Sequence, residues 1–463
     1  MATLTPPDVF DLPGLEARAR SRQKPDRSRL AELLAKARGL HGLTPDEAAF
    51  LLDVDDPEDR QQLLDVAIKV KQEIYGPRLV LFAPLYTSSH CTNDCLYCGF
   101  RATSGTARRR LTLEEIKAET RAIVAMGHKR VLMVAGEDVT LTPRDLAAQV
   151  EAIYSVHEPK GNIRRVNVNA APLDVEGFKV LKGAGIGTYQ CFQETYHPET
   201  YRRMHPRGPK SDYHGRLHVF DRCIPAGIDD FGMGFLFGLY DHRFETLALL
   251  QHIAWLEKTF GIGPHTISIP RLEPAEGTDV YETTPWKVSD DELLKVTAIL
   301  RLAVPYTGII LSTRETPALR HRLLQVGVSQ MSAGSITNPG GYAEGEDSVA
   351  QFEVQDHRSL DEVIREVCKE RYVPSFCTGC YRKGRTGEKF QSMAKHQHID
   401  TFCSLNAVAT LQEYLEDFAS PETRQVAERC LGEFIEQQTD PEMRAKMMEW
   451  RARIKKGERD IPY

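Results

Sequence analysis

The stretch LVLFAPLYTSSHCTNDCLYCGF at residues 79–100 joins an apolar run to a loop that contains three cysteines. The run Leu79 to Tyr86 has the length and apolar content of a buried strand. Directly after it come Cys91, Cys95 and Cys98, separated by three and then by two residues. Three thiols this close in one loop can converge on a single inorganic centre. The stretch therefore predicts a metal-dependent site at the end of a strand.

The pattern that begins here continues along the chain. Short apolar or β-branched runs alternate with amphipathic segments of helical spacing, over roughly the 250 residues that a barrel of eight such units needs. Eight strands predict an α/β fold, a (β/α)8 TIM barrel, and a doubly wound open sheet is the alternative. After the first run, the other seven are 130–134, 166–170, 188–193, 231–236, 266–270, 308–312 and 330–333.

Polar residues favour the barrel, because they follow the expected strands at their carboxyl ends. Barrel enzymes place their active sites at this end. Besides the cysteine loop, the residues in question are Glu137, Asn169, Glu194 and Arg314.

The barrel is expected at residues 79–340, with an extension on each side. Residues 1–78 have helical spacing and predict an N-terminal helical extension. The breaker cluster at residues 338–341, Asn-Pro-Gly-Gly, predicts a boundary. Residues 341–463 are expected to form a separate, mainly helical C-terminal cluster-binding domain.

Composition sets limits on location and partners. The 463 residues include 59 basic and 65 acidic ones, a net charge of −6, which favours neither a nucleic-acid nor a membrane partner. No signal pattern or long apolar run is present, so a cytoplasmic protein is expected. Ten cysteines in that compartment are not a disulfide framework. Cys191, Cys223, Cys368 and Cys430 lack cluster-like spacing and are interpreted as packing residues.

The first cysteine set has the chemistry of an iron–sulfur site. A cubane cluster has four irons, so three thiolates leave one iron open for another ligand. That iron can chelate the amino and carboxylate groups of S-adenosylmethionine (SAM). Two alternatives are a zinc site with His90 as fourth ligand and buried thiols without a metal.

A second cysteine set lies in the tail. Cys377, Cys380 and Cys403 have the spacing C-x2-C-x22-C. Again three ligands rather than four predict a cluster with an open iron. A zinc site completed by His396 or His398 is the alternative.

The first loop, with Gly99-Phe100 after it, resembles the signature of radical SAM enzymes. The resemblance implies a SAM-binding 4Fe-4S cluster, with adenine contacts from Tyr97 and Phe100. Ala135, Gly136 and Glu137 resemble the family's strand end that holds the methionine amino group. Asn169 and Glu194 are further candidate SAM contacts. Arg216 is a candidate partner of the SAM carboxylate, with a solvent-facing salt bridge as the alternative.

The whole chain, including CTGCYRKGRTGEKF at residues 377–390, resembles the HydG family of tyrosine lyases, maturases of iron-iron hydrogenase. A related tyrosine lyase of thiamine biosynthesis lacks this tail. The resemblance implies cleavage of L-tyrosine to p-cresol and dehydroglycine, followed by formation of carbon monoxide and cyanide at the second cluster on an extra iron. It also implies a reductant such as ferredoxin or flavodoxin, and hydrogenase maturation proteins as partners.

The same resemblance suggests residues for these steps. Arg314 is the candidate clamp for the tyrosine carboxylate, with Ser332 and Ser335 as neighbouring donors; an ion pair of Arg314 with Glu315 or another rim acid is the alternative. His265 matches the position proposed to bind the extra iron, at the rim opposite the SAM cluster. Two rival functions are a radical SAM lyase acting on another amino acid such as tryptophan, and a non-catalytic iron-carrying scaffold.

Overall fold

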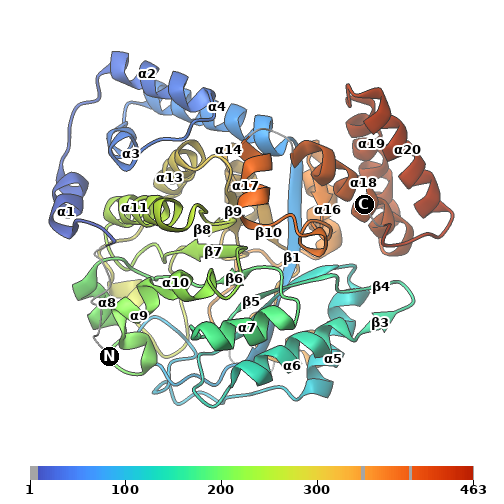
Figure 1. Cartoon of the computed structure of the whole chain (residues 1–463), viewed down its shortest axis with the longest axis horizontal. Helices are drawn as coiled ribbons and strands as arrows, with labels where there is room; N and C mark the ends of the chain where they lie inside the picture. Colours follow the sequence, from blue (N-terminus) through green and yellow to red (C-terminus); the bar gives the residue numbers. More distant parts are fainter. Residues whose placement is uncertain (1–8, 346–349, 396–398, 462–463) are drawn as a thin grey trace.

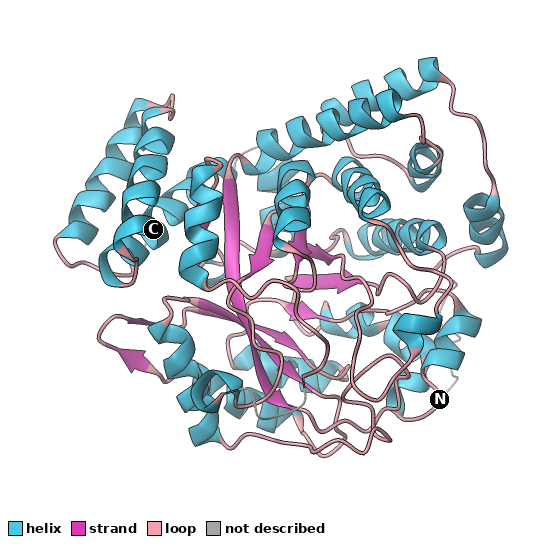
Figure 2. Cartoon of the chain, turned by 180° about the vertical axis from the view of Figure 1, so that it is seen from behind, coloured by secondary structure: helices cyan, strands magenta, loops and turns pink. Residues whose placement is uncertain are grey.

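A computed structural model describes residues 9–345, 350–395 and 399–461. Its centre is a ring of parallel strands enclosed by helices (Figure 1, Figure 2). The main sheet has nine strands, and β11 (Val373–Ser375) pairs only with β1, so eight strands form the ring. In ring order these are β1 (Arg78–Ser88), β2 (Arg130–Ala135), β5 (Arg165–Asn169), β6 (Tyr189–Gln190), β7 (Phe231–Gly234), β8 (Thr266–Ser268), β9 (Gly308–Leu311) and β10 (Gln330–Ser332).

The ring closes because β10 pairs in parallel with β1, from Val80 opposite Gln330 to Phe82 opposite Ser332. Closure confirms the TIM barrel and excludes the open doubly wound sheet. Each expected strand is present, although several are shorter than their apolar runs. Beyond β6, for example, Glu194 meets Phe235 only in an isolated bridge.

Helices between the strands cover the outside of the ring. Several begin at capping boxes, such as Thr112 with Glu115, in which each residue satisfies a free backbone donor of the other. Residues 213–223 form two helices rather than one, because His218 leaves helical geometry at φ −92° and ψ 25°. The helices are α5 (Leu113–Ala125), α6 (Pro143–Tyr154), α7 (Val175–Gly183), α8 (Pro198–Met204), α9 (Tyr213–Leu217), α10 (Val219–Cys223), α11 (His242–Phe260), α12 (Val280–Thr283), α13 (Asp290–Ala303) and α14 (Pro317–Val326), with a 3-10 turn at Pro209–Ser211.

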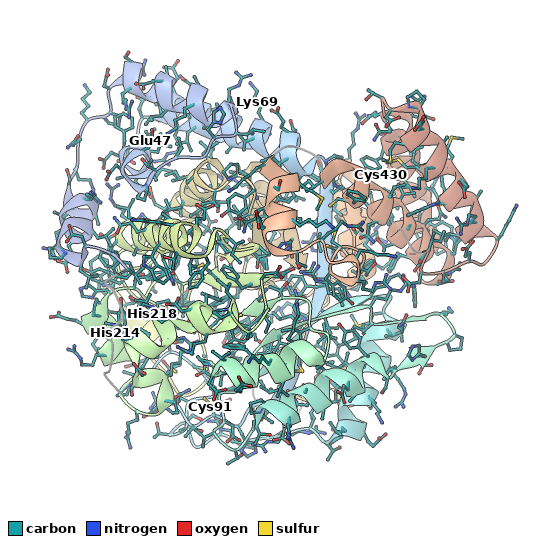
Figure 3. All side chains as sticks on the ribbon, in the orientation of Figure 1. Glu47, Lys69, Cys91, His214, His218 and Cys430 are labelled. Atoms are coloured by element: carbon teal, nitrogen blue, oxygen red, sulfur yellow. The ribbon has the colours of Figure 1, made fainter. Side chains whose placement is uncertain are left out.

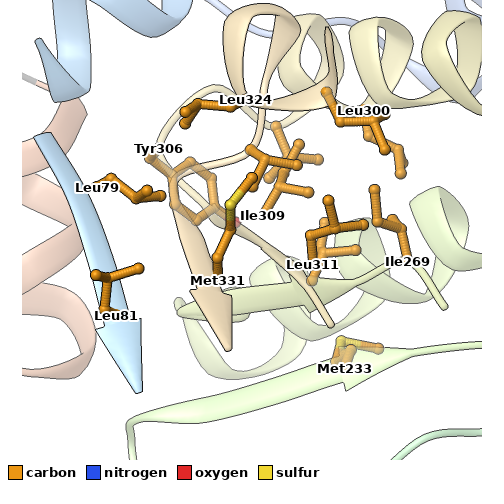
Figure 4. Close-up of a cluster of buried hydrophobic side chains, with 14 of the residues drawn as sticks. Leu79, Leu81, Met233, Ile269, Leu300, Tyr306, Ile309, Leu311, Leu324 and Met331 are labelled. Carbon is orange, nitrogen blue, oxygen red and sulfur yellow. The ribbon is translucent and has the colours of Figure 1, made fainter. Parts of the chain in front are cut away.

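The hydrophobic core lies between this helical layer and the ring. Figure 4 shows Leu300 and Leu324, from α13 and α14, above Ile309 and Met331 of β9 and β10. All four side chains are buried. Burying a leucine or isoleucine stabilises the fold by about 1.5–3 kcal/mol, so this layer fixes the strands whose other face lines the barrel interior.

The N-terminal extension is helical, as expected. It consists of α1 (Leu12–Arg20), α2 (Arg27–Arg38), α3 (Pro45–Leu52) and α4 (Pro57–Tyr75). Arg243 of α11 attaches the extension to the barrel, donating to the Leu52 carbonyl at 2.6 Å and to Asp53 at 2.6 Å.

The C-terminal part is mainly helical, but it does not leave the barrel at residue 340. Gln355 N donates to the Thr313 carbonyl at 2.9 Å, and buried Asp356 pairs with Arg320. These contacts hold residues 355 and 356 against the barrel, and the division of the chain at residues 78 and 340 stays a prediction. The elements are α15 (Gly341–Glu344), α16 (Leu360–Lys369), β11, a 3-10 turn (Tyr381–Lys383), α17 (Gly387–Lys395), α18 (Ile399–Asp417), α19 (Pro421–Glu436) and α20 (Pro441–Lys455).

A small antiparallel hairpin was not expected. Strands β3 (His157–Glu158) and β4 (Gly161–Asn162) pair outside the ring, after α6 ends at Tyr154. Among the described helices, none has the length and apolar character needed to cross a membrane.

Candidate functional site

A cavity of about 210 Å³ opens at the carboxyl ends of the strands. All three cysteines of the first loop line it, together with side chains from several strand ends. Residues from the sequence prediction that line this cavity are Cys91, Cys95, Cys98, Tyr97, Phe100, Ala135, Gly136, Glu137, Asn169, Glu194, Arg216, Arg314, Ser332 and Ser335. The fold thus brings together the candidate SAM and tyrosine residues.

Backbone contacts hold the cysteine loop against the neighbouring elements. Thr92 N donates to the Glu137 carbonyl at 2.9 Å, and Leu96 N donates to the Met204 carbonyl at 3.0 Å. Gly136 is required by this packing, because a Cβ there would lie 2.2 Å from the His90 carbonyl oxygen. The small residue at this strand end therefore allows the loop to approach β2.

The donor set suits an iron–sulfur cluster. Burial raises the pKa of Cys91, Cys95 and Cys98, so the thiolates need a compensating positive charge such as bound iron. His90 is exposed and does not line the cavity, which argues against it as a fourth zinc ligand. Among the described residues, no three Cys, His, Asp or Glu side chains are placed so that they could hold one metal ion together.

Four charged side chains, each at most 16% exposed, form a cluster beside the cysteines. Arg216 Nη1 donates to Glu137 Oε1 at 2.8 Å, and Lys210 Nζ donates to Glu194 Oε1 at 2.7 Å. The solvent-facing salt bridge considered for Arg216 is wrong, because its side chain is only 6% exposed. Arg216 and Lys210 lower the pKa of Glu137 against the effect of its burial, so this carboxylate is charged and can accept hydrogen bonds from an ammonium group.

Aromatic side chains form another wall. Phe100 meets Tyr86 edge to face at 6.0 Å, and the Tyr97 hydroxyl lies 2.8 Å from His205 Nε2. Phe100 is buried, whereas Tyr97 is partly exposed. An apolar wall beside the cysteine loop is suited to a purine ring.

Arg314 has an uncommitted charge in this cavity. Its guanidinium lies 3.4 Å from the centre of the Phe352 ring, and Nη1 donates to the Arg271 carbonyl at 3.2 Å. Glu315 pairs with Arg271 instead, so the alternative of an Arg314–Glu315 pair is wrong. Within the described ranges, Arg314 has no carboxylate within 4.0 Å, and Ser335 Oγ has no hydrogen-bond partner. A substrate carboxylate can use these donors.

A second cavity, of about 50 Å³, lies at the amino ends of the strands. Cys377, Cys380 and Cys403 all line it. Hydrogen bonding from Cys403, aided by Arg385 and Arg165, lowers the pKa of Cys380 to about 6. His396 and His398, the candidate zinc ligands, lie outside the described residues.

His265 also lines the second cavity, immediately before β8. Burial lowers its pKa to about 4, so the imidazole is neutral at neutral pH, the form that can bind a metal. Its Nδ1 lacks a hydrogen-bond partner and lies 4.0 Å from Asp230 Oδ2. The donor set of three thiols and one imidazole can hold a cluster with an additional iron.

The two cavities lie at opposite ends of one barrel. In β1, Val80 lines the second cavity, while Phe82, Pro84 and Tyr86 line the first, as alternation along an inward-facing strand requires. Cys91 lies at the lower edge of the molecule in Figure 3, whereas α17 and α18 lie above the strands in the same orientation in Figure 1.

Several residues of the first cavity were not expected from the sequence. Lys210 follows a glycine-proline turn with no motif of its own, and Asn93 bridges the loop to Glu137 through Nδ2 at 2.9 Å. Gln351 and Phe352 reach the cavity from the C-terminal part. Nothing in the local sequence pattern distinguishes these residues, because they meet only through the fold.

Two sequence families match the chain. Residues 85–251 match the Radical SAM superfamily, and residues 268–373 match the Biotin and Thiamin Synthesis associated domain. The 2-iminoacetate synthase of Escherichia coli (strain K12) is 32% identical over 336 residues, which are 72% of this chain and 86% of that protein.

Solved structures are similar over nearly the whole chain. A crystal structure of HydG, described as a maturase of the FeFe-hydrogenase, is 45% identical with a TM-score of 0.95, covering 98% of this chain and all of that one. HydG from Carboxydothermus hydrogenoformans is 42% identical with a TM-score of 0.80, covering 92% of this chain and 94% of that chain. The family implies a 4Fe-4S cluster and SAM. This chain therefore belongs to the radical SAM superfamily, as a lyase of the group that includes HydG and 2-iminoacetate synthase.

Proposed function

We propose that this protein cleaves L-tyrosine to p-cresol and dehydroglycine in the first cavity and converts the glycine-derived fragment to carbon monoxide and cyanide in the second. The observation that supports this proposal most is the presence of two separate three-cysteine cavities at opposite ends of one barrel. The products would serve assembly of the iron-iron hydrogenase cofactor.

In the first cavity, Cys91, Cys95 and Cys98 would hold the 4Fe-4S cluster. When bound, the cluster and SAM supply a 5′-deoxyadenosyl radical. Glu137 is charged and directed into the cavity, so it can accept hydrogen bonds from the methionine ammonium. Arg216 already pairs with Glu137, which supports a role in orienting that carboxylate.

Arg314 would bind the tyrosine carboxylate, with Ser332 and Ser335 as neighbouring donors. A carboxylate on Arg314 fixes the substrate amino group relative to SAM, and such positioning lowers the entropic part of the barrier. Asn169, Ala135, Tyr97, Phe100 and Glu194 would complete the SAM site.

In the second cavity, Cys377, Cys380 and Cys403 would bind the auxiliary cluster and His265 the extra iron. The neutral imidazole and the low pKa of Cys380 support ligation. Arg165, whose Nη1 lies 3.8 Å from Cys377 Sγ, adds positive charge beside the thiolates.

An anaerobic assay tests the proposal. Iron-reconstituted, reduced protein is mixed with SAM and either L-tyrosine or L-tryptophan, and 5′-deoxyadenosine, p-cresol and carbon monoxide are measured. We expect all three products with tyrosine and no p-cresol with tryptophan, because p-cresol can come only from the tyrosine side chain. Deoxyadenosine without p-cresol would contradict the tyrosine assignment. No deoxyadenosine at all would favour the iron-carrying scaffold.

A further inference from the structure

The segment after α20 contacts the loop that contains Cys377 and Cys380. The Asp460 carboxylate accepts two hydrogen bonds from Arg382, from Nη2 at 2.7 Å and from Nη1 at 2.8 Å. Arg382 Nε also donates to the Thr378 carbonyl at 2.8 Å. Thr378 lies between the two cysteines, so one guanidinium joins the tail to the cysteine loop.

Asp460 is itself attached to the barrel through a buried acid. Its backbone N donates to Glu413 Oε1 at 2.8 Å. Glu413 Oε2 lies 2.8 Å from Arg164 Nη2 and 3.1 Å from Lys129 Nζ, and all three side chains are at most 2% exposed. Arg164 and Lys129 directly precede β5 and β2, so the connection runs from the amino end of the barrel through α18 to the tail.

The third cysteine of the site lies on the same helix as Glu413. Cys403 is one of the first residues of α18, and Asn406 follows it by one turn. Asn406 Oδ1 accepts from Thr378 N at 3.3 Å, and its Nδ2 donates to Thr378 Oγ1 at 3.1 Å. The cysteine loop is thus attached to α18 twice, on one side by Asn406 and on the other by Asp460.

The contact holds backbone in a conformation that non-glycine residues rarely adopt. Cys377 has φ 47° and Asp460 has φ 53°, both in the left-handed region. Such residues persist only where surrounding contacts fix them. The Arg382 and Asp460 side chains are 35% and 38% exposed, so the pair by itself is weak, and its effect comes from the buried network behind it.

We propose that Asp460 is a positioning residue, which acts through Arg382 to fix Cys377 and Cys380 relative to Cys403 in the second cysteine site. A cluster held by all three thiolates requires the distances between their sulfur atoms to stay constant. The consequence for the cluster rests on the proposed function, whereas the effect on the loop does not.

The tail provides a matched control. Arg459 forms an equally close two-bond pair with Asp417 of α18, at 2.7 and 2.6 Å. This pair attaches the same segment to the same helix, and the other hydrogen bonds of Arg459 go to the Ile454 and Glu458 carbonyls. Asp460→Asn tests the proposal, since asparagine tolerates positive φ, and Arg459→Gln is the control.

Hydrogen exchange of the full-length metal-free chain is the first measurement. With Asp460→Asn, we expect amides of residues 377–385 to exchange roughly tenfold faster, while Arg459→Gln leaves them unchanged. Arg382→Gln should give the same acceleration, and combining it with Asp460→Asn should add nothing. Unchanged exchange in Asp460→Asn, or equal acceleration in Arg459→Gln, would overturn the proposal.

Iron retention is the second measurement. Chains with Cys91, Cys95 and Cys98 changed to alanine keep only the second site, and their iron is challenged with a chelator after reconstitution. Asp460→Asn is expected to lose iron roughly tenfold faster than its parent, the range typical of residues that orient metal ligands. Equal rates of iron loss from Asp460→Asn and from its parent would show that Asp460 does not position the cluster ligands. A parent that binds no iron would contradict the proposed function instead, and the exchange result would still decide the positioning role.

Discussion

Replacing Cys95 by alanine is expected to abolish reductive cleavage of SAM. The three thiols of the first cavity are the whole protein ligand set proposed for its cluster, and Cys95 is the most deeply buried of them. We expect 5′-deoxyadenosine formation to fall at least about 1,000-fold, which corresponds to about 4 kcal/mol of barrier. Liquid chromatography of anaerobic reactions with SAM and L-tyrosine measures this loss.

Cys191→Ala is the matched control for this variant. Cys191 is equally buried and close to Arg216, but it does not line the first cavity. It should retain deoxyadenosine formation, and the Cys95→Ala chain should still bind iron at its second site. Deoxyadenosine formed by Cys95→Ala at the parental rate would contradict the assignment of this loop.

The Arg314→Gln variant is expected to lose tyrosine-dependent activity but to bind SAM as the parent does. The variant keeps a polar side chain but removes the charge that faces the cavity. Leaving a buried carboxylate without its cation costs about 3–5 kcal/mol, so kcat/KM for tyrosine should fall about 150-fold to 5,000-fold. Initial rates of p-cresol formation at several tyrosine concentrations measure the effect.

The control for Arg314 is its neighbour Arg271. Arg271→Lys keeps a cation beside buried Glu315 and does not alter the cavity wall, so p-cresol formation should change little. The dissociation constant for SAM should stay within about twofold of the parental value in both variants, because neither Arg314 nor Arg271 is among the residues proposed to bind SAM. A larger effect of Arg314→Gln on SAM than on tyrosine would contradict the proposed clamp.

The sequence predicts the barrel well because its strands are apolar runs bounded by breakers. The eight runs lie on the eight ring strands, and the helices between them follow 3.6-residue spacing and capping boxes. By contrast, β11 reads Val-Pro-Ser, too short and too rich in proline for a strand pattern, yet it pairs with β1 outside the ring. This strand packs against α16 and α18, which are contacts that the local sequence does not reveal.

The candidate site also has residues that the sequence predicts and residues that only the structure reveals. Cysteine spacing identifies both three-thiol sets, because ligand loops are local in sequence. The pairing of Arg216 with Glu137 joins residues 79 positions apart and depends on how α9 meets the loop that follows β2. Lys210 and Phe352 belong to the first cavity for the same reason. Residues of this kind have no pattern of their own, so their placement needs the structure.

The most direct test of the central claim, two cavities with separate tasks, is product analysis of a Cys377→Ala, Cys380→Ala variant. The parent and Cys430→Ala, which changes a packing cysteine in the same C-terminal part, are measured alongside under anaerobic conditions with SAM and L-tyrosine. We predict p-cresol within about twofold of the parent, because distant sites act independently, and no detectable carbon monoxide. If the variant formed carbon monoxide and p-cresol in the same ratio as the parent, the separate task of the second cavity would be contradicted.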